Sequence, residues 1–151
     1  VSSINRPTEK IFEIEVKPGW KAGTKLTYEM EGDELPGGRG FQDIEIIIME
    51  KPHAQFVREG ANLTVHSEVP LWKALTGFKQ DISTLDNRIL RVNVKDIVKP
   101  GYTKVVKGEG MPKSKAPGTR GDLVLTFDVI YPTHLTDHQK SVIRETLAPN
   151  L

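Results

Sequence analysis

The chain contains no cysteine, which excludes disulfide bridges, cysteine–zinc sites and thiol nucleophiles. It has no run of about 18 apolar residues, the length that a membrane-spanning helix needs, and no basic and then apolar start typical of a signal peptide. The chain has 21 lysines and arginines and 20 acidic residues, so its net charge is close to zero. It therefore lacks the strong positive potential that favours nucleic-acid binding. We therefore expect no membrane and no nucleic-acid partner. We also expect a cytoplasmic location, since a chain without cysteine is compatible with a reducing compartment.

The signals that are present are mostly those of β-strands. Apolar and polar residues alternate with a period of two in many short segments, as in half-buried strands. Strands are expected over residues 10–16, 25–30, 43–50, 62–69, 78–85, 89–94, 105–106 and 122–130. The segment 43–50 has a nearly continuous apolar centre, so we expect it to be covered on both faces.

Two helices are expected among these strands. Pro70 fits the first position of a short helix that Gly77 can end. The other helix lies near the C-terminus, within residues 135–147, where Thr136 and Gln139 have the spacing of a capping box.

One short motif occurs twice, as KPGW at Lys17–Trp20 and as KPGY at Lys99–Tyr102. Each copy is followed by a short strand, a Glu-Gly pair, a loop rich in glycine and proline that ends in Arg-Gly, an aspartate and a strong strand. Because the whole series recurs in the same order, we predict two similar small β-rich domains, sandwich-like or barrel-like, in tandem. The predicted ranges are 1–52 for the first domain, 53–134 for the second, and 135–151 for the helix and tail.

The two predicted domains differ in what precedes the repeated turn. In the second, the whole stretch from Phe56 to Lys95 builds strands and a short helix before the turn. In the first, the chain reaches the turn already at Lys17, so only a short segment precedes it. We therefore expect the first domain to be truncated at its N-terminus and to lack two strands and the helix.

Several longer segments carry a resemblance in their order along the chain. They are KPGWKAGTKLTY, EGD, KPHAQFVREGANL, LWKALTGF, TLDNR, VKPGYTKVVKGEGMP, RGDLVLTFDVIYP and LTDHQKSVI. Together they resemble the C-terminal region of the DnaJ-type (J-domain, forty-kilodalton heat-shock) co-chaperones, over about residues 9–147. The resemblance implies two similar β-rich domains in series, a C-terminal dimerisation helix, binding of unfolded polypeptide clients, and delivery of these clients to the seventy-kilodalton heat-shock chaperone.

The chain departs from the family pattern in ways that narrow the expectation. The J-domain and the cysteine-rich zinc module are both absent, which favours class B (type II) and predicts no stimulation of the partner's ATPase by this chain alone. The acidic pair that usually precedes the second domain is replaced by Ala61-Asn62. The strands that line the family's main peptide groove would precede residue 1.

Two sets of candidate site residues follow. Val142, Ile143 and Leu147 form a thin apolar stripe on the last helix, which is too short to be stable alone. Docking on its own domain and pairing with a second copy both remain open, and the resemblance favours a homodimer. By the logic of the repeat, a weak client-binding depression is expected at four exposed positions, Val65, Ser67, Ile82 and Thr84. The alternative, that Val65 and Ile82 are core residues, also remains open.

No set of residues points to catalysis, a metal or a cofactor. The four histidines have no third ligand at metal-binding spacing, and no Ser/His/Asp set or pair of carboxylates stands out, so we expect neither an enzyme nor a cofactor. The Arg120-Gly121-Asp122 tripeptide is interpreted as a tight turn and the Asn62-Leu63-Thr64 sequon as unused. Trp72 is interpreted as a core residue, and the alternative that it is a ligand anchor remains open. The rival hypothesis is a β-sandwich hydrolase or a carbohydrate-binding module.

Overall fold

The computed structural model describes residues 9–150 and confirms a mainly β fold with a short C-terminal helix. The described residues divide into two compact units. Unit 1 holds the chain up to Lys51 together with the loop Pro112–Arg120, and unit 2 holds Pro52–Met111 and the chain from Gly121 onward. The ranges proposed for the domains from the sequence stay predictions.

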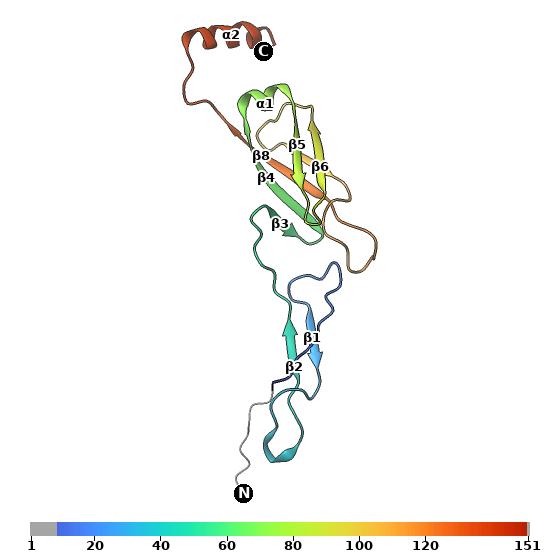
Figure 1. Cartoon of the computed structure of the whole chain (residues 1–151). Helices are drawn as coiled ribbons and strands as arrows, with labels where there is room; N and C mark the ends of the chain where they lie inside the picture. Colours follow the sequence, from blue (N-terminus) through green and yellow to red (C-terminus); the bar gives the residue numbers. More distant parts are fainter. Residues whose placement is uncertain (1–8, 151) are drawn as a thin grey trace. The chain divides into compact units, whose positions relative to one another are not determined.

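Unit 2 contains a four-stranded sheet and a separate hairpin (Figure 1). The sheet has the order β3 (Phe56–Glu59), β4 (Asn62–Pro70), β8 (Leu123–Ile130) and β7 (Thr103–Val106). The central strands β4 and β8 are parallel, and both edge strands are antiparallel to their neighbours. The hairpin consists of β5 (Phe78–Ser83) and β6 (Ile89–Val94), and the short helix α1 (Leu71–Thr76) joins β4 to β5.

The core of unit 2 lies between this sheet and the hairpin. Alternate side chains of β4 and β8 point to one face because of the two-residue period of strands. The buried apolar residues include Leu63, Val65 and Val69 of β4, Leu123, Leu125 and Phe127 of β8, and Ile82, Val92 and Val94 of the hairpin. The ring of Phe78 meets that of Phe127 edge-on, with centroids 5.8 Å apart. The strand expected over residues 62–69 is therefore confirmed.

Turn and cap chemistry explains where the elements of unit 2 end. Asn87 adopts a positive φ of 62° in the β5–β6 turn, a conformation that asparagine tolerates well. Pro70 lies just before α1, at its N-cap rather than at the first helical position, and Gly77 ends the helix. The last helix, α2 (Asp137–Leu147), has the predicted capping box between Thr136 and Gln139, and a short 3-10 turn, η2 (Ala148–Asn150), follows it.

Unit 1 is smaller and has a much thinner interior. Its sheet consists of β1 (Lys25–Tyr28) and β2 (Ile44–Ile47), which pair antiparallel, and a 3-10 turn η1 (Pro36–Gly38) lies between them. No apolar side chain of its described residues is fully buried. The expectation that both faces of 43–50 are covered is wrong, because Ile47 and Met49 are exposed while Ile44 and Ile46 are half-buried.

The sequence repeat corresponds to a repeat of local geometry. In both KPG motifs the backbone N–H of the aromatic residue, Trp20 or Tyr102, donates to the carbonyl of the lysine three residues earlier. The β1–β2 pair in unit 1 corresponds to the β7–β8 pair in unit 2. An aspartate before the second strand of each pair, Asp43 or Asp122, accepts a backbone N–H, from Met30 and Gly108 respectively.

Residues 10–16 form no strand, which corrects the sequence prediction. A strand requires a hydrogen-bonded neighbour, and no described strand pairs with this segment. Residues 10–16 correspond to β6 of unit 2. In each unit, a basic residue at the start of this segment forms an ion pair with the glutamate of the Glu-Gly pair. Lys10 pairs with Glu31 in unit 1, and Arg88 pairs with Glu109 in unit 2. The alternation of apolar residues thus predicted a strand at a place where the repeat has one, but none of the described strands pairs with residues 10–16.

Candidate functional site

The four residues predicted as a client-binding depression do not form one exposed surface. Val65 and Ile82 are 3% and 1% exposed and belong to the core, so their predicted exposure is corrected in favour of the alternative. Ser67 faces the same interior, where its hydroxyl oxygen accepts a hydrogen bond of 2.7 Å from the side-chain amide of Gln80. The physical reason is the two-residue period, which turns these positions of β4 and β5 toward each other.

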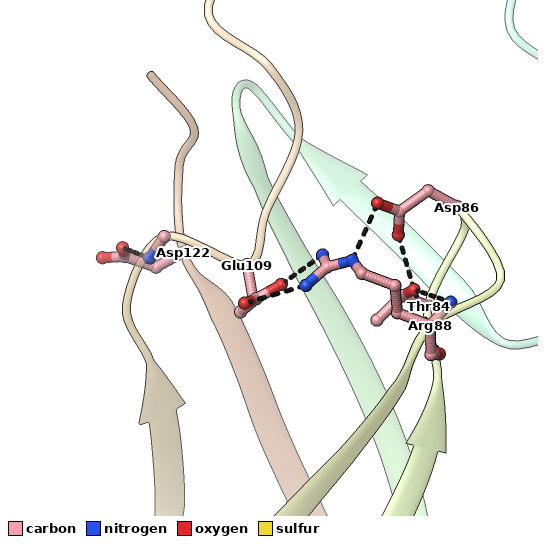
Figure 2. Close-up of polar contacts among 6 residues, drawn as sticks. Thr84, Asp86, Arg88, Glu109 and Asp122 are labelled. Carbon is pink, nitrogen blue, oxygen red and sulfur yellow. Dashed lines mark hydrogen bonds and ion pairs between the residues drawn. The ribbon is translucent and has the colours of Figure 1, made fainter. Parts of the chain in front are cut away.

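Thr84 belongs to a polar cluster at the β5–β6 turn (Figure 2). Its hydroxyl donates to Asp86 Oδ1 at 2.5 Å and accepts the backbone N–H of Arg88 at 2.9 Å. The guanidinium of Arg88 donates from Nε to Asp86 Oδ2 at 2.9 Å and from Nη2 to Glu109 Oε2 at 2.7 Å. The cluster thus fixes the hairpin turn to the loop that carries Glu109.

The charges of this cluster stabilise one another in the ionised state. Hydrogen bonds from Arg88 and then from Thr84 hold the pKa of Asp86 well below its usual value. The hydrogen bonds of Arg88 to Glu109 and then to Asp86 raise the pKa of the guanidinium. Because Asp86 and Arg88 are both ionised at neutral pH and neither is poised to exchange a proton, the cluster has a structural role.

His66 lies between Thr126 and Asp128 on the outward face of the sheet in an arrangement that resembles a hydrolase triad. Its Nδ1 is 2.8 Å from Thr126 Oγ1, and its Nε2 is 2.6 Å from Asp128 Oδ2. In a working triad the carboxylate is buried, which holds the imidazole in place. Here the side chains of His66 and Asp128 are both more than half exposed. We therefore interpret the three residues as a surface hydrogen-bond chain between β4 and β8.

Other motifs also have structural explanations. A Cβ built at Gly121 would lie 2.1 Å from the carbonyl oxygen of Ala61, so the Arg-Gly-Asp tripeptide sits in a tight backbone crossing. The side-chain oxygen of Asn62, the sequon residue, accepts the backbone N–H of Asp122 at 2.9 Å. Within residues 9–150, no group of three or more potential ligands could hold a metal ion.

Unit 2 has a shallow hollow of about 400 Å³ lined by Asp96, Ile97, Lys99 and Tyr102. Burial and then the negative charge of Asp96 raise the pKa of the Tyr102 hydroxyl, which is 3.4 Å from that carboxylate. This hydroxyl therefore stays protonated at neutral pH and donates to Asp96. The hollow has one aromatic ring, one carboxylate and one lysine. This set does not form the aromatic platform of a sugar-binding site or the paired acid and base of a hydrolase.

The helix α2 presents an uncovered apolar stripe, formed by Val142, Ile143 and Leu147. These side chains are 46%, 42% and 39% exposed, and no described residue of α2 is buried. An isolated helix of this length is only marginally stable in water, so we expect another protein surface to cover the stripe. None of the described helices is long and apolar enough to cross a bilayer.

Unit 1 presents a second uncovered apolar surface along Lys10–Val16, here called the open segment. Ile11 is 90% and Val16 64% exposed, while Phe12 packs on Tyr28 of β1 with ring centroids 4.6 Å apart. In β6, the counterpart of the open segment, Val92 and Val94 are almost completely buried. Val16 differs from its counterpart Val94 because β6 has β5 as its neighbour. Ile11 corresponds to Ile89, which is itself 70% exposed. The unequal lengths before the two KPG turns predict such an uncovered face within residues 11–16, because a domain that lacks two strands leaves an edge of its sheet unpaired.

Trp72 is another exception to the sequence expectation. It was expected in the core beside Leu71 and Leu75, but it is 64% exposed and its ring lies under the ammonium group of Lys73, 5.5 Å from the ring centroid. On this short helix, only Ala74 is buried.

Comparison with known proteins identifies the family. The family described as DnaJ C terminal domain matches residues 2–132. Human DnaJ homolog subfamily B member 13 is 45% identical over 92% of the chain and 44% of its own length. Human DnaJ homolog subfamily B member 5 is 39% identical over 94% of the chain and 40% of its own length. The yeast Saccharomyces cerevisiae protein SIS1 is 39% identical over 89% of the chain and 38% of its own length.

The chain thus spans less than half the length of these curated relatives. The matches nevertheless cover nearly all of the chain itself, and they agree with the series of motifs around the two KPG turns. The two human relatives named above are subfamily B members. The chain belongs to the DnaJ C-terminal domain family.

Proposed function

We propose that this chain is the client-binding and dimerisation part of a DnaJ-type co-chaperone. It holds non-native polypeptide that the seventy-kilodalton heat-shock chaperone then receives. The observations that carry this proposal are the match of residues 2–132 to the DnaJ C-terminal domain family and the uncovered apolar surface of unit 1, where Val16 is 64% exposed while its counterpart Val94 is buried. Membership of the family supports the role.

The mode of binding that fits this surface is strand addition. An extended client can hydrogen-bond with the backbone of the open segment, and backbone bonds do not depend on the client's sequence. Apolar side chains of the client then cover the exposed ones of unit 1, which contributes about 25 cal/mol for each Å² of apolar surface removed from water. Such a site suits unfolded chains, since they expose both free backbone and apolar side chains.

Pairing of two α2 helices would add avidity to this weak, unspecific binding. If the stripes of two copies face each other, each dimer presents two open segments to the same client. The second contact is then intramolecular, and its effective concentration can reach the millimolar range for a short flexible connection. A dimer should therefore retain long unfolded clients better than short ones.

The test of the proposal is suppression of aggregation. A chemically denatured model protein is diluted into buffer with and without the chain, and light scattering is followed. We expect a dose-dependent decrease in scattering near stoichiometric amounts, with no nucleotide required. Unchanged scattering, combined with turnover of simple ester or glycoside substrates, would instead support the hydrolase hypothesis.

A further inference from the structure

The outward face of the β5–β6 hairpin changes in charge from its turn toward its open end. Near the turn, Arg91 of β6 donates at 3.0 Å to Asp81, the residue of β5 that lies opposite it. The next outward pair is Lys79 and Asn93, and Lys95 comes two residues after Asn93, just past the end of β6. All three of these residues are exposed. The charges of the hairpin are therefore balanced near the turn, whereas the open end carries two lysines.

The side chains at the open end border a hollow of about 310 Å³ in unit 2, here called the lysine hollow. Its other walls are Phe78, Val94 and Thr76–Gly77, which link α1 to β5. None of the residues that line it has a carboxylate. Within the described part of the chain, neither Lys79 nor Lys95 belongs to an ion pair. The lysine hollow thus has two positive charges and no negative one.

The acidic residues nearest to these lysines along the chain have partners elsewhere. Asp81 is in the ion pair described above, and Asp96 lines the separate 400 Å³ hollow, where it accepts the hydroxyl of Tyr102. Like charges at neighbouring positions of a strand pair repel each other. Lys79 and Lys95 therefore raise each other's electrostatic energy, and an anion bound between them would lower it.

The size and lining of the lysine hollow indicate which anion fits it. Its volume is at the lower end of that of small-molecule sites, so it can hold one short side chain and not a folded surface. Each lysine ammonium has three donors and the amide of Asn93 has two, a set that suits the oxygens of a carboxylate. The half-buried ring of Phe78 adds an apolar wall, which favours a carboxylate on a short aliphatic chain over a free inorganic anion.

We propose that the lysine hollow binds the side-chain carboxylate of a glutamate or aspartate in an unfolded client. All of the residues that carry this inference belong to unit 2, so the contact is separate from the open segment of unit 1. The inference rests on the proposed function and adds to it a preference among clients, namely for unfolded segments that contain acidic residues.

Two fluorescein-labelled nine-residue peptides test this preference by fluorescence anisotropy with the whole chain. Both have amidated C-termini and the same alanine and leucine positions, and they differ in carrying glutamate or glutamine at the remaining positions. Because pairs between exposed charges are individually weak, we expect the glutamate peptide to bind about fivefold more tightly, and the difference to shrink in high salt. In the Lys79→Gln/Lys95→Gln variant the two peptides should bind with equal affinity.

The matched control is Lys107→Gln/Lys140→Gln, which removes the same charge at two exposed positions of unit 2 outside the lysine hollow. It should keep the preference for the glutamate peptide. An equal loss of preference in this control would show a general charge effect and overturn the inference, as would a preference that persists in the Lys79→Gln/Lys95→Gln variant. Equal or absent binding of both peptides by a wild-type chain that still suppresses aggregation would also overturn it, while the proposed function stands. Absent binding together with absent suppression would refute both.

Discussion

Replacing both Ile143 and Leu147 by aspartate is expected to convert dimers of this chain into monomers. The two side chains belong to the stripe of α2, and each is about two-fifths exposed in the single chain. Burying an apolar side chain of this size contributes at most about 1.5–3 kcal/mol, and symmetry doubles the number of side chains in a two-fold interface. After the entropic cost of association, micromolar affinity is within reach. Two carboxylates per helix would remove this gain and add repulsion.

Sedimentation equilibrium measures the outcome against the mass of one chain, 16.9 kDa. The matched control is Ser141→Asp/Ala148→Asp, which introduces the same two charges at an exposed position of α2 outside the stripe and at the first residue of the turn that follows it. It should remain dimeric, and both proteins should keep the circular dichroism of the β-rich units. An aspartate variant of the stripe that still sediments as a dimer would locate the interface elsewhere, and a wild-type chain that stays monomeric at high micromolar concentration would contradict pairing through α2.

The second large effect is expected for Ile82→Ser. Ile82 is 1% exposed and is among the most completely buried large side chains of the described chain. The substitution removes most of the side chain from the core and places a hydroxyl there, so we expect a loss of at least about 3 kcal/mol in the free energy of unfolding. The same substitution at Ile89, which is 70% exposed in the paired strand of the same hairpin, should cost less than about 1 kcal/mol.

Urea denaturation of the two variants, followed by circular dichroism, gives this comparison directly. Similar midpoints for Ile82→Ser and Ile89→Ser would show that Ile82 is not a core residue. A large difference would confirm that the β4–β5 interior is a core and not a groove.

Much of unit 2 could be predicted because its sequence signals are local. The alternation along β4 and β8, the Asp86-Asn87 turn and the Thr136 capping box each depend on neighbours within a few residues, and the structure has all of them. The repeated KPG turn indicated a tandem organisation for the same reason. It combines proline, which fixes φ, with a glycine at positive φ, and this pair is recognisable without tertiary information.

The sequence could not predict which apolar faces are covered. Alternation shows that a residue such as Ile11, Val65 or Ile82 lies on one face of a strand, but covering that face depends on a second element distant in sequence. Val65 and Ile82 are buried because β4 and the hairpin pack together. Ile11 is exposed, and no described strand pairs with its segment. Two core residues were therefore assigned to a binding surface, while the stripe of α2 was identified correctly as apolar and remains a prediction as an interface.

Client affinity of Val16→Ser compared with Ile89→Ser is the most direct test of the central claim, that unit 1 binds non-native polypeptide through the open segment. Val16 and Ile89 are 64% and 70% exposed, so neither substitution should unfold the protein. A fluorescein-labelled, permanently unfolded client titrated with each variant reports its affinity by anisotropy. We predict a loss of at least fivefold for Val16→Ser, because a paired strand buries the equivalent Val94, and wild-type affinity for Ile89→Ser. Equal affinities of the two variants would contradict the account.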